Sequence, residues 1–274
     1  MSKKLSFAIF QIRNFRLLLC ARMFATMAMR SQAVIVGWQV YSLTKDPFLL
    51  GLTGLTEALP AMLCASFAGH FVDIGSPRRV YVLCIGTLAL NTFILLLIAG
   101  NVIAAPPEYI LPAIFTGVFI SGAARSFMAP ASFSLLPKVV SRTELPTAVT
   151  MISGALQSAT VCGPAIAGLI YGGYEAKGAW IFPVFLLGIS FLMACFIRVT
   201  HARSLEKHQP VWQSIRTGWR FIFKTPVLLS MMMLDWLAVL FGGAVAMLPV
   251  YAYQILHVGA EGLGVLRAAP ALGA

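Results

Sequence analysis

Long apolar stretches alternate with short polar breaks along the whole chain. A helix needs about 20 predominantly apolar residues to cross the hydrocarbon core of a bilayer. By this measure the sequence predicts seven spans and the start of an eighth. Their expected limits are residues 15–43, 48–72, 79–100, 109–136, 147–173, 179–199, 226–257 and 261 onward. The pattern therefore predicts an all-α membrane protein that lies in a lipid bilayer.

The composition agrees with a membrane protein, and it disfavours several kinds of partner and site. Charged residues make up 11% of the chain and hydrophobic residues 59%, whereas a soluble domain carries about 25% charged residues. The net charge of +11 does not indicate a nucleic acid partner, because the basic residues lie in the breaks between apolar runs. The five cysteines fall in separate apolar stretches without paired spacing, which disfavours disulfides and metal sites. We expect no cofactor.

The basic residues also predict an orientation. With the N-terminus inside, nearly all lysines and arginines between the spans are cytoplasmic, and only Lys45 and Lys177 lie outside. The first apolar run is too long for a signal peptide and lacks a small-residue cleavage site. The N-terminus is therefore expected in the cytoplasm, and the first apolar run is expected to be a spanning helix.

One polar break is longer than the others and divides the chain. It contains Trp212, Ile215, Trp219 and Phe223 at helical spacing, with basic residues between them, which predicts an amphipathic helix on the inner membrane surface. The expected domains are a six-helix bundle over 1–200, a cytoplasmic linker over 201–225, and the start of a second bundle over 226–274.

The second part repeats the first. An offset of about 210 residues aligns Val40 with Val250, Tyr41 with Tyr251 and Pro60 with Pro270. Two parallel six-helix repeats are a transporter architecture, and two repeats of this length need roughly 420 residues. We therefore expect the chain to be truncated at its C-terminus, with the remaining C-terminal helices present only in a full-length protein.

Charged residues inside the spans are candidates for function, because a charge at the bilayer centre costs several kcal/mol. Six fall there: Arg22, Arg30, Glu57, Arg125, Asp235 and Arg267. Glu57 and Arg30 have similar expected depths, so they are predicted to pair. The pair is either a structural lock between the first two helices or a proton- or cation-binding site, in which Arg30 favours the charged form of Glu57.

The other intramembrane charges carry further hypotheses. Arg267 is the repeat equivalent of Glu57, so the two are candidates for a gate between the halves. Asp235 is a second coupling candidate, or it forms a packing hydrogen bond to an arginine such as Arg22. Arg125 is expected to extend toward the cytoplasmic end of its helix, or else to pair with Asp73.

Two stretches carry local structural signals. The first runs from Gly69 to Arg79, GHFVDIGSPRR, and predicts a tight polar turn in which Asp73 closes one helix and Arg78 and Arg79 begin the next. The second lies in the fifth span. There Gly163 and Pro164 interrupt the helix, and Gly168 allows a close approach to a neighbouring helix.

These stretches resemble known transporter motifs. The stretch from Gly69 to Arg79 resembles the signature loop between spans two and three of the major facilitator superfamily. The stretch MAPASFSLLPK from Met128 to Lys138 is similar to the loop after span four in the branch of enterobactin-type siderophore and macrolide exporters. GPAIAG, from Gly163, resembles the antiporter motif of the fifth helix.

The resemblance implies twelve spans, alternating access and export of a drug-like or siderophore-like molecule coupled to proton entry, in a bacterial inner membrane. It also implies that the loop after Gly69 gates transport on the cytoplasmic side, with Asp73 as a latch. We group Arg125 with this gating loop because of its possible pairing with Asp73. No nucleotide-binding loop occurs in the sequence, and the chain is not expected to be an enzyme. The alternatives are uptake by the same fold, a non-transporting membrane protein, or an incomplete fragment.

Overall fold

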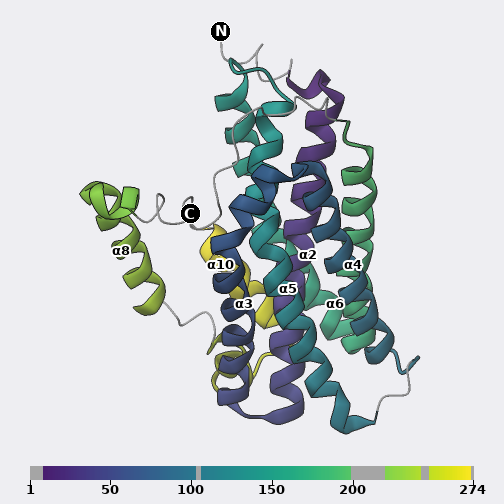
Figure 1. The fold of residues 1–274 in the computed structure, drawn as a ribbon. Helices are drawn as coiled ribbons and strands as arrows, with labels where there is room; N and C mark the ends of the chain where they lie inside the picture. The colour runs from purple at the N-terminus through teal and green to yellow at the C-terminus, as the bar shows by residue number, and fades with distance from the viewer. Residues whose placement is uncertain (1–8, 103–105, 199–219, 242–246, 273–274) are drawn as a thin grey trace.

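The protein folds into a lengthwise bundle of long helices (Figure 1). The computed structural model describes residues 9–102, 106–198, 220–241 and 247–272, and these ranges contain helices and turns but no strand. The bundle consists of α2 (Arg13–Thr44), α3 (Pro47–Ile74), α4 (Pro77–Ala99), α5 (Pro107–Leu135) and α6 (Leu145–Phe196). Beyond it come α8 (Pro226–Phe241), α9 (Leu248–Val250), the π-helical turn η3 (Tyr251–Ile255) and α10 (Ala260–Leu272).

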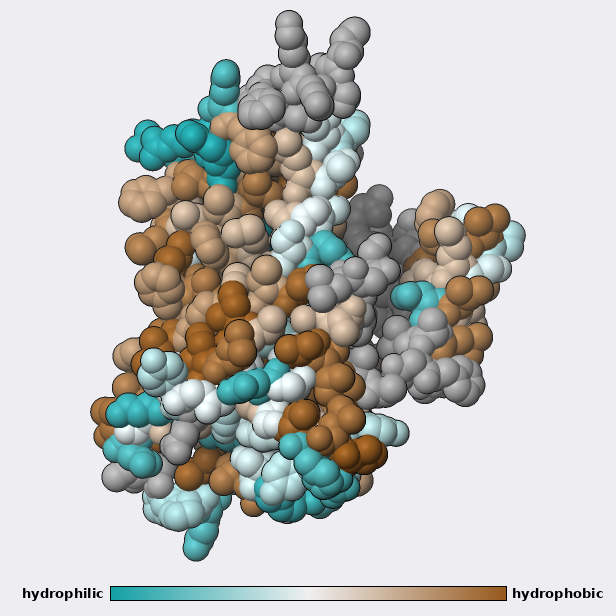
Figure 2. Space-filling model, turned by 180° about the vertical axis from the view of Figure 1, so that it is seen from behind, coloured by the Kyte–Doolittle hydropathy of each residue, from teal (hydrophilic) through white to brown (hydrophobic). Residues whose placement is uncertain are grey.

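The predicted all-α membrane protein is confirmed. Five segments of the described chain are long and apolar enough to cross a membrane: Pro47–Ala65, Pro77–Ala99, Pro107–Lys138, Leu145–Tyr174 and Ala176–Phe196. Figure 2 shows the matching surface pattern on one face, which is apolar across the middle and hydrophilic toward both ends. A bilayer needs this distribution, since its hydrocarbon core offers no partners to polar groups.

The first helix, α2, is long enough to span but is less apolar than the others. It has 32 residues, or about 48 Å of helix, and it carries Arg22 and Arg30 within that length. Its polar side chains Ser31, Gln32 and Gln39 are buried inside the bundle. The low hydropathy of α2 therefore reflects a helix that faces protein on several sides and places polar groups in the interior.

Helix α6 contains two spans joined by a sharp reversal. A straight helix of its 52 residues would be about 78 Å long. Its first residue, Leu145, and Arg198 just after its end both lie near the start of α2, where Arg198 exchanges hydrogen bonds with Asn14. Its middle lies at the far end of α4, where Lys177 packs beside Gly100. The chain therefore folds back there, as the predicted spans 147–173 and 179–199 require.

Hydrogen bonds between helices close the bundle at each end. At the arginine-rich end, defined by Arg78 and Arg198, the Arg78 guanidinium donates to the carbonyl oxygen of Cys195 at 2.6 Å. At the opposite end, defined by Lys45 and Lys177, the Trp180 indole donates to Gln39 Oε1 at 3.0 Å, and both side chains are buried. Two apolar clusters pack around these contacts, which fixes α2 between the two halves of α6.

The predicted turn from Gly69 to Arg79 is shorter than expected. Helix α3 continues to Ile74 and α4 begins at Pro77, so only Gly75 and Ser76 separate them. A Cβ at Gly75 would lie 2.8 Å from the Phe71 carbonyl oxygen, which favours glycine at this tight turn. Arg79 is exposed. The side chain of Asp73 lies outside the described part, so its role as a latch stays a prediction.

Within the described residues, the seventh predicted span, 226–257, is divided among α8, α9 and η3. Helix α8 ends at Phe241, residues 242–246 lie outside the described ranges, and α9 and η3 follow. Figure 1 shows α8 standing apart from the bundle, while α10 packs along it. Apolar side chains of α8 such as Met231 and Leu234 are 68% and 72% exposed. They therefore bury little against the described part of this chain.

The predicted linker over 201–225 falls mainly on residues 199–219, which the structure does not describe. Residues 220–224 are helical. The predicted domain limits and the amphipathic character of the linker therefore stay predictions.

Candidate functional site

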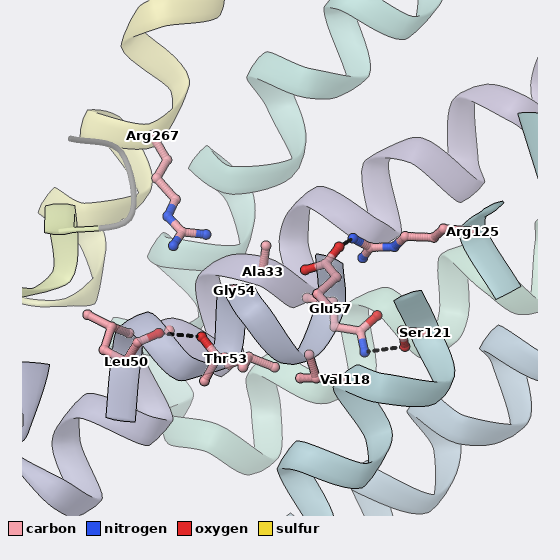
Figure 3. Close-up of a pocket in the computed structure, with 12 residues that line it drawn as sticks. Ala33, Leu50, Thr53, Gly54, Glu57, Val118, Ser121, Arg125 and Arg267 are labelled. Carbon is pink, nitrogen blue, oxygen red and sulfur yellow. Dashed lines mark hydrogen bonds and ion pairs between the residues drawn. The ribbon is translucent and has the colours of Figure 1, made fainter. Parts of the chain in front are cut away.

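A cavity opens in the middle of the bundle between α2, α3, α5 and α10. Its volume is about 150 Å³, which is below the range of about 300 to 1,000 Å³ that is usual for drug-sized ligands. Its wall combines apolar side chains with a few polar ones: Gln32, Ala33, Val36, Gly37, Leu50, Thr53, Gly54, Glu57, Val118, Ser121, Arg125 and Arg267. Figure 3 shows Arg125 and Arg267 approaching it from different helices.

The centre of the site is an ion pair between Glu57 of α3 and Arg125 of α5. Arg125 Nη1 donates to Glu57 Oε1, and the side chains are 23% and 37% exposed for Arg125 and Glu57. Arg125 Nη2 also donates to the Met29 carbonyl oxygen of α2 at 3.2 Å. One guanidinium thus joins three helices at the cavity wall, and its charge-assisted bonds fix the position of the carboxylate.

A glycine makes this pairing possible. Gly122 lies three residues before Arg125 and on the same side of α5, where α5 crosses α3. A Cβ at Gly122 would overlap the backbone carbonyl oxygen of Glu57 and would lie 3.1 Å from Pro60 Cγ. The missing side chain lets the two backbones approach closely, which brings Arg125 within reach of Glu57.

Arg267 enters the cavity from α10 and rests against α2. Its Nη2 lies 3.2 Å from the position that a Cβ on Gly37 would take, and its Nε is buried without a hydrogen-bond partner. The carboxylate of Glu57 attracts it and the guanidinium of Arg30 repels it. The predicted repeat pair, Glu57 and Arg267, therefore faces one cavity, but within the described chain the two form no ion pair.

A buried polar network supports the cavity from behind. Asn91 Nδ2 of α4 donates to Ser121 Oγ at 3.0 Å and to the Gly117 carbonyl oxygen at 2.9 Å, and Gln32 Nε2 of α2 lies 3.4 Å from the same Ser121 oxygen. These bonds hold α2, α4 and α5 in register beside the ion pair. Sequence reasoning missed Asn91, although a lone asparagine within the apolar run of α4 was its signal.

The structure changes the predicted partner of Glu57. Arg30 was expected to pair with it, but Arg125 takes that position. Arg30 is exposed on α2 and repels Arg125. The expectation that Arg125 extends to the end of its helix is wrong too, as is its assignment to the gating loop, because its guanidinium lies in the central cavity.

Two further candidates lie away from the cavity. Asp235 is exposed on α8. Arg22 lies over the Phe133 ring, with its Cζ 5.0 Å from the ring centroid, and it is not the hydrogen-bond partner of Asp235 in this structure. The hypothesis that Asp235 couples transport therefore gains no geometric support.

At the fifth-span motif the structure shows close helix packing, but the predicted interruption at Gly163 and Pro164 is not found, because α6 is helical through both residues. A Cβ at Gly163 would lie 2.7 Å from the Met27 carbonyl oxygen of α2, and one at Gly168 would lie 2.6 Å from the Ala260 carbonyl oxygen of α10. The carbonyl oxygen of Gly163 also accepts a bond from Ser31 Oγ at 2.9 Å. The segment that includes Pro164 thus packs tightly against α2 on one side and α10 on the other.

Aromatic side chains join α2 to η3 at the Lys45 end. Tyr253 of η3 packs edge-on against both Trp38 and Tyr41, with ring centroids 6.1 Å and 5.6 Å away. The Lys45 ammonium lies over the Tyr253 ring, 3.8 Å from its centroid, which is a cation–π geometry. Pro249 of α9 packs beside Gly37. The segment from α9 to η3 therefore covers the cavity wall at this end.

Comparison with known proteins identifies the fold family. The model of the Major Facilitator Superfamily matches residues 18–274, and no curated protein matches the chain. Within the described residues, no group of histidine, cysteine, aspartate and glutamate side chains is arranged to hold a metal ion.

Proposed function

Because the chain belongs to the Major Facilitator Superfamily, a family of membrane transporters that are typically not enzymes, we propose that it exports a small organic molecule in exchange for protons. The substrate is drug-like or siderophore-like, and alternating access moves it across the membrane. The observation that carries the proposal is the Glu57–Arg125 pair on the wall of a central cavity.

The pair supplies a mechanism for coupling. A proton that binds Glu57 neutralises its carboxylate and removes most of its attraction to Arg125. The contact between α3 and α5 weakens as a result, which favours the conformation in which the two helices are less tightly joined. Loss of the proton on the other side of the membrane restores the pair and resets the cycle.

The distribution of charge supports an orientation. Arg78, Arg79 and Arg198 gather at one end of the bundle, and the positive-inside rule favours a cytoplasmic location for that end. We assign the protein to the plasma membrane, the inner membrane of a bacterium. The direction of transport rests on the resemblance of the segment from Gly163 to Gly168 to an antiporter motif.

Transport in vesicles tests the proposal. In inside-out vesicles acidified internally, a panel of fluorescent organic anions, cations and neutral compounds should include at least one that accumulates. Glu57→Gln should reduce this proton-driven accumulation about 10-fold or more, which corresponds to about 1.4 kcal/mol, because the variant binds no proton at this position. Exchange of labelled for unlabelled substrate without a pH gradient should persist.

Asp235→Asn is the matched control, since it also removes a carboxylate but on the exposed α8, and it should transport as the unaltered protein does. Accumulation that occurs only in right-side-out vesicles would assign uptake instead of export. Proton-driven accumulation that survives Glu57→Gln unchanged would contradict the coupling mechanism.

A further inference from the structure

The cavity carries more positive than negative charge. Three guanidinium groups, those of Arg30, Arg125 and Arg267, act on one another or on the single carboxylate of Glu57. Arg125 is paired with Glu57, and within the described ranges neither Arg30 nor Arg267 has a carboxylate within ion-pair distance. Arg267 therefore lines the cavity without a carboxylate partner, and Arg30 lies exposed on α2 nearby.

A positive charge like that of Arg267 is costly at this depth. A cation that is removed from water needs an opposite charge or several hydrogen bonds to offset the lost hydration. Arg267 has neither in the described chain, and its Nε is buried without a partner. Figure 3 shows its guanidinium directed into the cavity, toward Ala33 and Glu57. Within the residues that the structure describes, no carboxylate pairs with it, so an anion in the cavity would neutralise it.

The other side chains that line the cavity indicate the shape and polarity of the anion that would fit it. Val36, Leu50 and Val118 give the cavity an apolar side, and Gln32 presents a buried Oε1 that has no hydrogen-bond partner. The unpaired arginine and the apolar surface line one cavity, so they suit a molecule that has an acidic group at one end and an apolar body. An inorganic ion would leave the apolar side empty.

We propose that the substrate is a small organic anion, whose carboxylate or similar oxyanion pairs with the Arg267 guanidinium. A guanidinium matches such a group with two parallel hydrogen bonds. Arg30 adds long-range attraction, and the apolar body of the substrate packs on Val36, Leu50 and Val118. This inference rests on the proposed function and specifies the substrate class of the same cavity.

Binding by a matched set of probes tests the charge preference. The full chain, purified in a neutral detergent without lipid, is titrated with 2-naphthoate, 2-naphthamide and 2-naphthylmethylammonium, which share one ring system and differ in charge. We expect 2-naphthoate to bind about 10-fold or more tightly than the amide, and the ammonium compound to bind most weakly. Arg267→Gln should abolish this preference, and Arg267→Lys should retain part of it.

A second variant keeps the test informative if Arg267→Gln does not fold. In Gly37→Ala the new methyl group would occupy space 3.2 Å from Arg267 Nη2, so the guanidinium must shift while its charge remains. The affinity for 2-naphthoate should fall several-fold, and the affinity for the amide should stay the same. Gly51→Ala is the control, because a Cβ there meets nothing within 4 Å.

The outcomes separate this inference from the proposed function. Equal binding of anion and amide, preferential binding of the ammonium compound, or an anion preference that survives Arg267→Gln would overturn the inference, even if the protein exports other compounds. A preference for the anion that depends on Arg267 would support it, even if vesicles showed no proton-driven export. If 2-naphthoate binds only after anionic lipid is added, the site does not bind the free anion and the inference fails.

Discussion

An Arg125→Gln variant is expected to lose about 1 to 3 kcal/mol of stability. Removing one partner of a buried ion pair leaves the other charge uncompensated, which costs about 3 to 5 kcal/mol in a fully buried site. Here the two side chains are 23% and 37% exposed, so water screens part of that cost. The variant also lacks the hydrogen bond that Arg125 donates to the Met29 carbonyl oxygen. Reversible unfolding of the purified protein in mixed micelles measures the change.

A double-mutant cycle separates the pair from its surroundings. Glu57→Gln removes the charge that Arg125→Gln leaves behind, so the double variant should be more stable than Arg125→Gln alone, with a coupling energy of about 1 to 2 kcal/mol. Arg79→Gln, which removes an exposed arginine, should change stability by less than about 0.5 kcal/mol. Simple additivity of Glu57→Gln and Arg125→Gln would show that the two groups do not interact.

The pairing of Glu57 shows how far the sequence leads and where it stops. Apolar length predicts the helices well, because a bilayer imposes nearly the same length on every span. With the predicted fourth span ending at residue 136, Arg125 lies about 16 Å from that end, which is the depth expected for Glu57. The sequence could therefore predict the depth of Arg125 in the membrane. It could not predict whether Arg30 or Arg125 pairs with Glu57, because that depends on which helices cross.

Helix crossings depend on contacts between segments that lie far apart in the chain. Gly122 is one of many glycines in the sequence, and nothing in its neighbourhood distinguishes it as the residue that meets the Glu57 backbone. The separation of α8 has a similar origin. An apolar run of this kind predicts a helix, but its position depends on partners that bury it, and the described part of the chain buries little of it.

Gly122→Ala is also expected to lower the stability of the protein strongly, although it adds only a methyl group. The new Cβ would overlap the carbonyl oxygen of Glu57, and a backbone atom inside a helix cannot rotate away as a side chain does. Helices α3 and α5 must therefore separate, at a cost of about 1 to 3 kcal/mol. Gly154→Ala is the control, since a Cβ there meets nothing within 4 Å, and it should be neutral or slightly stabilising.

The decisive measurement for Gly122→Ala is the double-mutant cycle between Glu57 and Arg125, repeated in that background. Arg125 lies three residues beyond Gly122 on the same side of α5, so a displacement of the helix moves its guanidinium away from the carboxylate. The coupling energy should then fall below about 0.5 kcal/mol, although both charged residues are still present. An unchanged coupling energy, together with unchanged stability, would mean that the crossing of α3 and α5 is not what positions the pair. A loss of coupling in Gly122→Ala but not in Gly154→Ala would establish that the close approach of these two backbones, and not the charges alone, creates the site.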